Sequence, residues 1–237
     1  MANWITHEYI VDNILNKGLS LDKKGFCVGN IAPDCNLENA DWTEYIPPRE
    51  KTHWMSGAKK TDDDYKRFFH EIIKEQKFES IEHLSYLLGY YAHLITDVEF
   101  NKFMNDEKHI QVVFERLKAE KNMKNQIKGY PETKDTLKKV FGKRGFLYDI
   151  VIFENNYVLN NPDCAYNRIL RNIQQFTDYL EIFPKGAITR KINIMAYEVT
   201  EPLKQEKFFF FTNDEYEDFI DRTSNKVYEL LVETGYC

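Results

Sequence analysis

One stretch of the chain decides the fold, and it reads LLGYYAHLITD from Leu87 to Asp97. Its apolar residues predict a buried helix, and buried helices seldom carry ionisable groups without a partner. His93 and Asp97 lie four residues apart, so a helix places both side chains on one face, one turn from each other. Such a pair is half of a metal site, or else a core histidine hydrogen-bonded to an aspartate. The stretch alone leaves both interpretations open.

The composition is that of an ordinary globular protein, with 237 residues, of which 43% are hydrophobic and 15% aromatic. This length suits one domain, and we expect a single domain over residues 1–237. The net charge of −6 argues against a nucleic-acid polymer as the partner, because such proteins carry a positive surface. No signal peptide is visible and no apolar run is long enough to span a membrane, so we expect a cytoplasmic protein.

Apolar residues recur with helical spacing along most of the chain, and no segment alternates convincingly with period two. The predicted fold is therefore all-α, a multi-helical bundle. Residues 25–54 contain several glycines and prolines and are predicted to be mostly loop, whereas residues 118–128 are predicted to be a charged connector. Residues 148–159 are apolar enough to belong to the core. The predicted helices cover residues 4–17, 64–76, 80–104, 107–120, 131–141, 163–182, 187–203 and 213–234.

Five side chains are the candidate metal ligands of this sequence. They are His7 on the first predicted helix, Asp34 and His53 on the predicted loop, and His93 and Asp97 on the central helix. Three imidazoles and two carboxylates are a normal ligand set for one zinc ion, or for two that share a bridging carboxylate. Each residue alone is better explained as a cap, a surface group or a core group, but their joint occurrence favours a metal site. None of the four cysteines forms a C-x2-C pair, so we expect free thiols, with a Cys27–Cys35 bridge as the less favoured alternative.

The order of four motifs resembles a known family. These motifs are Thr6-His7, the segment Gly29–Asp34 (GNIAPD), Thr52-His53-Trp54, and the segment Leu88–Asp97. Together they are similar to the zinc-dependent phospholipase C family, which includes the N-terminal domain of glycosylphosphatidylinositol-specific phospholipase D. The family is more distantly related to the P1-type nucleases. The resemblance covers about residues 1–105.

The resemblance implies an all-α phospholipase C/P1 nuclease fold with a zinc cluster in a cleft. Asp34, His53, His93 and Asp97 would bind one zinc, and His7 would bind a second that Asp97 bridges. In the secreted relatives a processed N-terminal tryptophan also binds the second zinc, but Trp4 is not the first residue here. The family's third zinc uses a further histidine, where this chain has Asn101, and a His-x3-Glu pair that is absent after residue 97. We therefore expect one or two zinc ions and no third site.

The function implied by the resemblance is zinc-dependent hydrolysis of a phosphodiester by a metal-activated hydroxide. The substrate would be a small-molecule or lipid-headgroup phosphoester, and Asp34 would be the catalytic residue that orients or deprotonates the water. Thr52 and Trp54 could support the ligands, and Tyr90 and Tyr91 could line the pocket or simply pack in the core. Two alternatives stay open: a metal-binding protein of the same fold that is non-catalytic or uses a different small phosphate, and a helical domain without metal.

Overall fold

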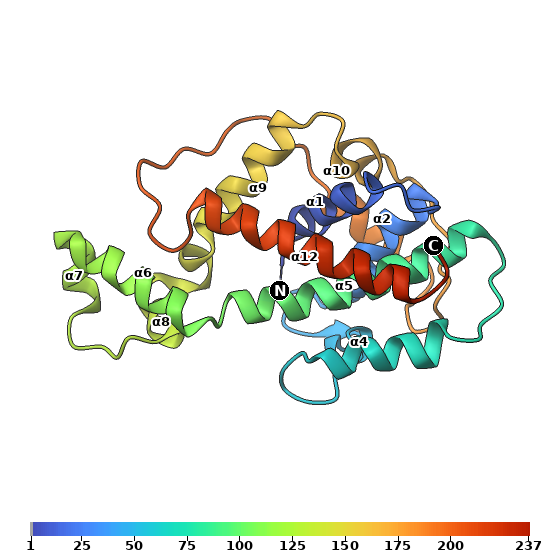
Figure 1. Ribbon diagram of the computed structural model, residues 1–237, viewed down its shortest axis with the longest axis horizontal. Helices are drawn as coiled ribbons and strands as arrows, with labels where there is room; N and C mark the ends of the chain where they lie inside the picture. Colours follow the sequence, from blue (N-terminus) through green and yellow to red (C-terminus); the bar gives the residue numbers. More distant parts are fainter. Residues whose placement is uncertain (1) are drawn as a thin grey trace.

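Helix α5 (Ile81–Phe103) runs through the middle of the molecule, and other helices lie along it on several sides (Figure 1). The computed structural model describes residues 2–237. The hydroxyl of Ser80 caps α5 by accepting a hydrogen bond from the backbone N–H of His83. Every residue from Ser85 to Val98 is buried, as the apolar pattern of this stretch predicted. The helix therefore carries His93 and Asp97 inside the protein.

Helix α2 (Lys23–Ile31) packs along α5 so closely that the two backbones touch. A Cβ atom on Gly29 would overlap the carbonyl oxygen of Tyr86, and one on Gly89 would overlap that of Phe26. The prediction of a mostly irregular segment over residues 25–54 was wrong at this point. Its glycines, which suggest chain breaks, are instead the positions where only a hydrogen atom fits between two helices.

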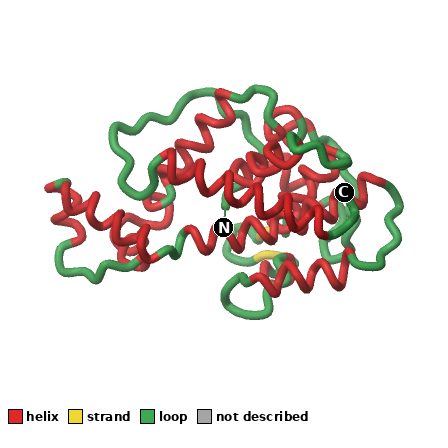
Figure 2. The backbone as a smooth tube through the Cα atoms, in the orientation of Figure 1, coloured by secondary structure: helices red, strands yellow, loops and turns green. Residues whose placement is uncertain are grey.

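The rest of residues 25–54 is short and irregular. A 3₁₀ turn, η1 (Ala32–Asp34), follows α2 directly. The strands β1 (Leu37–Glu38) and β2 (Tyr45–Ile46) form an antiparallel pair, which is the only sheet in residues 2–237 (Figure 2). One turn of helix, α3 (Arg49–Thr52), ends at His53.

The first and last helices lie side by side and close one face of α5 (Figure 1). Helix α1 (Trp4–Leu15) matches the prediction for residues 4–17, and α12 (Asn213–Glu233) matches that for residues 213–234. A capping box starts α12, in which Thr212 and Glu215 exchange hydrogen bonds. On another side, α4 (Asp62–Phe68) and the π-helical turn η2 (Phe69–Ile73) pack against α5.

The remaining helices extend the molecule at one end and complete its upper part (Figure 1). Residues 118–128 are not a simple connector, because they contain a short helix. Residues 148–159 were expected in the core and are a helix that is partly buried, and Phe210 and Phe211 are buried. All four cysteines are free. The bounds are α6 (Glu107–Ala119), α7 (Lys121–Ile127), α8 (Lys134–Phe146), α9 (Tyr148–Asn160), α10 (Ala165–Arg168), η3 (Leu170–Asn172) and α11 (Ala187–Met195).

The long helix predicted over residues 163–182 is wrong. Only α10 and η3 are helical there, and the chain then continues without regular structure. Asn172 donates its side-chain amide to the carbonyls of Asn167 and Arg168, and asparagine side chains that bond to nearby backbone compete with helix formation. The apolar residues of the predicted stripe, such as Ile173 and Leu180, are nevertheless buried. The helix predicted over residues 187–203 also ends early, at Met195.

Candidate metal centre

The five predicted ligands meet at one buried point, although they come from four separate parts of the chain. His7 lies in the first turns of α1, Asp34 ends η1, and His53 follows α3, whereas His93 and Asp97 lie on α5. The three histidines and Asp97 are at most 1% exposed. The Asp34 side chain is 9% exposed, so it alone of the five reaches toward solvent.

Three of these side chains, His53, His93 and Asp97, have the spacing of ligands around one tetrahedral ion, and Asp34 contacts His53 beside them. The Nε2 atom of His53 is 3.2 Å from Asp34 Oδ1 and 3.4 Å from Asp97 Oδ2. The Nε2 atom of His93 is 3.3 Å from Asp97 Oδ2 and 3.3 Å from His53 Nε2. Ligands held about 2.0–2.1 Å from a tetrahedral zinc lie roughly 3.3–3.4 Å from one another. The residues present therefore fit the ion that the resemblance implies.

Backbone carbonyls fix which nitrogen of each imidazole faces the centre. The Nδ1 atom of His93 is 2.7 Å from the carbonyl oxygen of Asn30, and that of His53 is 3.1 Å from the carbonyl oxygen of Arg49. A carbonyl only accepts, so both Nδ1 atoms carry the proton and both Nε2 atoms present a lone pair. Lone pairs and carboxylates that converge on one point are suited to bind a cation there. Thr52, whose hydroxyl lies 3.0 Å from His53 Nδ1, supports this ligand as expected.

His7 and Asp97 mark a second position beside the first. The His7 ring stacks on His93 with centroids 4.0 Å apart, and neither of its nitrogens has a hydrogen-bond partner within residues 2–237. Its Nε2 atom is 4.0 Å from Asp97 Oδ1, whereas Asp97 Oδ2 faces His53 and His93. The two oxygens of Asp97 thus face different imidazoles, which is the arrangement of a bridging carboxylate. The backbone N–H of Ala2, rather than any atom of Trp4, donates to Asp97 Oδ1 at 3.3 Å.

Burial keeps the ligands in the protonation states that a metal needs. Burial lowers the pKa of His7 to about 3 and that of His53 to about 4, and it also holds the pKa of His93 well below its usual value. Burial works to raise the pKa of Asp34, but the adjacent His53, His93 and Lys60 outweigh burial and leave that pKa well below normal. At neutral pH the imidazoles are therefore neutral and Asp34 is ionised, as metal ligands must be.

Lys60 is part of the centre, although no motif of the sequence indicated it. It lies on the loop between His53 and α4, and its Nζ atom contacts Asp97 Oδ2. Burial, and then the charge of Arg49, lowers the pKa of Lys60 to about 6. Lys60 thus occupies the carboxylate oxygen that a metal ion would take, and its lowered pKa leaves it largely uncharged at neutral pH. The sequence gives no signal for this contact, because it depends on how an irregular loop folds back.

Comparison with protein families places these residues in context. The family described as zinc dependent phospholipase C matches residues 6–136, which is more than half of the 237 residues. The chain belongs to the zinc-dependent phospholipase C family. The same comparisons found no matching curated protein and no matching solved structure. The matched region, residues 6–136, contains all five ligand candidates. In general, the family supports the function of a metal-dependent phosphoesterase.

The residues that are expected to differ from the family's third zinc site lie just beyond Asp97. Asn101, one turn further along α5, bonds through its side chain to Asn105 at 2.8 Å. The groups of potential ligands that meet within residues 2–237 are His7, Asp34 and His93, and His53, His93 and Asp97. The absence of a third zinc site remains a prediction, as does the similarity to glycosylphosphatidylinositol-specific phospholipase D.

The other histidine of α5, His83, is buried and stacks on Tyr179.

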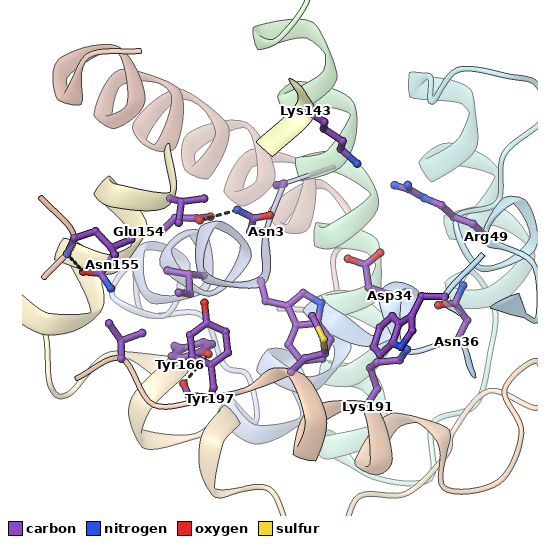
Figure 3. A pocket seen from close by; sticks show the side chains of 18 of the residues that line it. Asn3, Asp34, Asn36, Arg49, Lys143, Glu154, Asn155, Tyr166, Lys191 and Tyr197 are labelled. Carbon is purple, nitrogen blue, oxygen red and sulfur yellow. Dashed lines mark hydrogen bonds between the residues drawn. The ribbon is translucent and has the colours of Figure 1, made fainter. Parts of the chain in front are cut away.

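A cavity of about 520 Å³ opens beside the centre, with Asp34 in its wall (Figure 3). Trp4 lines it from the first turn of α1, and the remaining wall comes mainly from residues 143–203, beyond the family match. Tyr90 is not part of this wall: it is fully buried, stacks on Phe68, and donates its hydroxyl to the carbonyl of Thr52. None of the helices in residues 2–237 is long and apolar enough to cross a membrane.

Proposed function

We propose that this protein is a zinc-dependent phosphoesterase that hydrolyses a phosphodiester of a small molecule or a lipid headgroup. The observation that carries the proposal is the tetrahedral spacing of the Nε2 atoms of His53 and His93 and an oxygen of Asp97, in a chain of this family, with Asp34 beside them in a cavity wall. The proposal covers one domain, residues 1–237, because the family match supplies the ligands and the remaining helices supply much of the cavity.

The ligand set divides between two ions. Asp34, His53, His93 and Asp97 would hold the first zinc, and His7 with Oδ1 of Asp97 would hold the second. Zinc, when bound, lowers the pKa of a coordinated water toward neutrality and neutralises charge on the phosphoryl oxygens. The protein's part is to keep the imidazoles neutral, the carboxylates ionised, and the rings fixed by the Asn30 and Arg49 carbonyls.

Asp34 is the proposed catalytic residue. It is the only ligand that also lines the cavity, so its carboxylate faces both the centre and an incoming substrate. Its lowered pKa keeps it ionised at neutral pH, and an ionised carboxylate accepts hydrogen bonds only. Asp34 therefore orients the attacking water by accepting one of its hydrogens.

The second candidate function is a metal-binding protein of the same fold without phosphodiesterase activity. The observation in its favour is the contact of Lys60 Nζ with Asp97 Oδ2, because a side chain at a ligand oxygen obstructs a fully loaded pair of sites. In this case the protein would bind at most one zinc and turn over no phosphodiester.

Metal content and diester hydrolysis separate these functions. We expect the protein purified without chelator to hold one to two zinc equivalents and to hydrolyse bis(p-nitrophenyl) phosphate. His93→Ala and Asp97→Ala should each lose zinc and at least about 100-fold in activity, because each removes a ligand of the first site. His83→Ala on the same helix is the control and should keep both. Zinc without turnover would favour the second function, and equal turnover in wild type and His93→Ala would rule out the first.

A further inference from the structure

Two cationic side chains reach into the cavity from different walls, near Asp34. Arg49 comes from α3 and Lys143 from α8, and Figure 3 shows both reaching into the space near the Asp34 carboxylate. Neither forms an ion pair with any acidic group in residues 2–237. The Nε atom of Arg49 is buried and has no hydrogen-bond partner there. These two charges are therefore not used by the fold.

The other cations of this region already have anionic partners. Lys191, in the same cavity wall, is paired with Glu38, which also binds Arg190. Lys60 is paired with Asp97. The acid at the far end of the cavity, Glu154, is occupied by hydrogen bonds from Thr6 and Asn3 (Figure 3). The end of the cavity beside the metal centre therefore carries two positive charges, Arg49 and Lys143, that have no anionic partner in residues 2–237.

We propose that Arg49 and Lys143 bind a second negatively charged group on the substrate, beyond the phosphoryl group that is cleaved. The substrate is thus a phosphoester with a further phosphate or comparable anion, rather than one with a cationic choline headgroup. This inference rests on the proposed function, since it places the reacting phosphoryl group at the metal centre beside Asp34. The anion can belong to a lipid headgroup or to a free phosphorylated small molecule.

Charge explains the selectivity. The partly buried guanidinium of Arg49 and the ammonium of Lys143 gain charge-assisted hydrogen bonds from a phosphate, each on the order of a tenfold change in affinity or more. A quaternary ammonium at the same place would meet like charges and could donate no hydrogen bond. Arg49 also helps to hold His53, but through its backbone carbonyl, so replacing its side chain leaves that contact possible.

The test measures binding of matched ligands to the zinc-loaded protein by titration calorimetry. The probes are myo-inositol 1-phosphate, myo-inositol 1,4-bisphosphate and phosphocholine. We expect the bisphosphate to bind at least about tenfold more tightly than the monophosphate, and phosphocholine most weakly. Arg49→Gln and Lys143→Gln should each reduce this preference at least threefold. The controls Lys51→Gln and Lys138→Gln remove exposed charges from the same two helices and should preserve it.

Each outcome decides the inference. Equal binding of the two inositol phosphates, or a preference that survives both Arg49→Gln and Lys143→Gln, overturns it. If Arg49→Gln does not fold, the exposed Lys143 carries the test alone. Faster hydrolysis of phosphatidylinositol 4-phosphate than of phosphatidylcholine in mixed micelles assigns the anion to a lipid headgroup, whereas selective binding of the soluble bisphosphate alone assigns it to a free phosphate. If the protein hydrolyses bis(p-nitrophenyl) phosphate but does not prefer the bisphosphate, only this inference is contradicted. If it prefers the bisphosphate but hydrolyses no diester, only the proposed phosphoesterase function is contradicted.

Discussion

The carboxylate of Glu154 shows how one residue from a distant helix positions the centre. It accepts hydrogen bonds from the Thr6 backbone N–H at 3.2 Å, from the Thr6 hydroxyl at 2.5 Å and from the Asn3 side chain at 2.7 Å. These donors belong to the start of α1, so Glu154 caps that helix from α9. Because Thr6 precedes His7, the same contacts fix where the His7 ring can lie.

Glu154 gives the protein a defined pH dependence. Burial raises its pKa from 4.5 to about 7, so the folded protein holds this proton more tightly than the unfolded chain. Its contribution to stability is therefore complete below about pH 4.5 and is lost as the pH rises to about 7, by about 3 kcal/mol at most. In the metal-free protein, Glu154→Gln should abolish this loss. Urea denaturation of wild type and variant at pH 5 and pH 8 measures it, and a pH-independent difference between the two proteins would contradict the assignment.

At the scale of elements, the contact between α2 and α5 brings two parts of the centre together. Gly29 and Gly89 let the backbones touch, and the same contact brings the Asn30 carbonyl to His93 Nδ1. Asp34 follows three residues after Ile31, the last residue of α2. A change in the distance between these helices therefore moves an imidazole and a carboxylate relative to each other.

Gly89→Ala should consequently harm both stability and metal binding. Alanine improves helix propensity by about 1 kcal/mol, but overpacking against the Phe26 carbonyl costs about 1–3 kcal/mol or more. We expect a net loss in the free energy of unfolding and a loss of at least about tenfold in zinc affinity. Gly145→Ala is the matched control, because its Cβ would meet only Phe141 Cβ at an ordinary 3.6 Å. Unchanged zinc affinity in Gly89→Ala would show that the contact does not position the ligands.

Sequence patterns indicated five residues that the structure brings close together, because these residues lie in helices or in compact motifs; their role as metal ligands stays a prediction. The i,i+4 spacing placed His93 and Asp97 on one face, and the structure joins them to His7, Asp34 and His53. Patterns failed where contacts are formed between distant residues. Nothing local marks Lys60 or Glu154 as neighbours of the centre, because their positions depend on a loop and on packing across the chain. The same limit explains why the glycines of α2 suggested a loop.

At the scale of the whole molecule, the ligands join segments that are otherwise held only by packing. The centre connects α1, η1, the residue after α3, and α5, and residues 143–203 form much of the adjoining cavity. An ion bound here contacts the folded chain at four places that the unfolded chain does not bring together. Binding of zinc is therefore coupled to the stability of the entire protein.

Removing zinc should thus lower the melting temperature substantially. With free zinc at about 1,000 times its dissociation constant, the folded state gains about 4 kcal/mol, which for a chain of this size corresponds to roughly 10 °C. Calorimetric melting of zinc-loaded and chelator-treated protein measures this shift. His93→Ala should lose nearly all of it, because His93 is a proposed ligand of the first site, whereas His7→Ala should retain a part, because the residues proposed for the first site remain. Equal loss in both variants would mean that a single ion uses His7 and His93 together, and no shift in wild type would contradict a resident zinc.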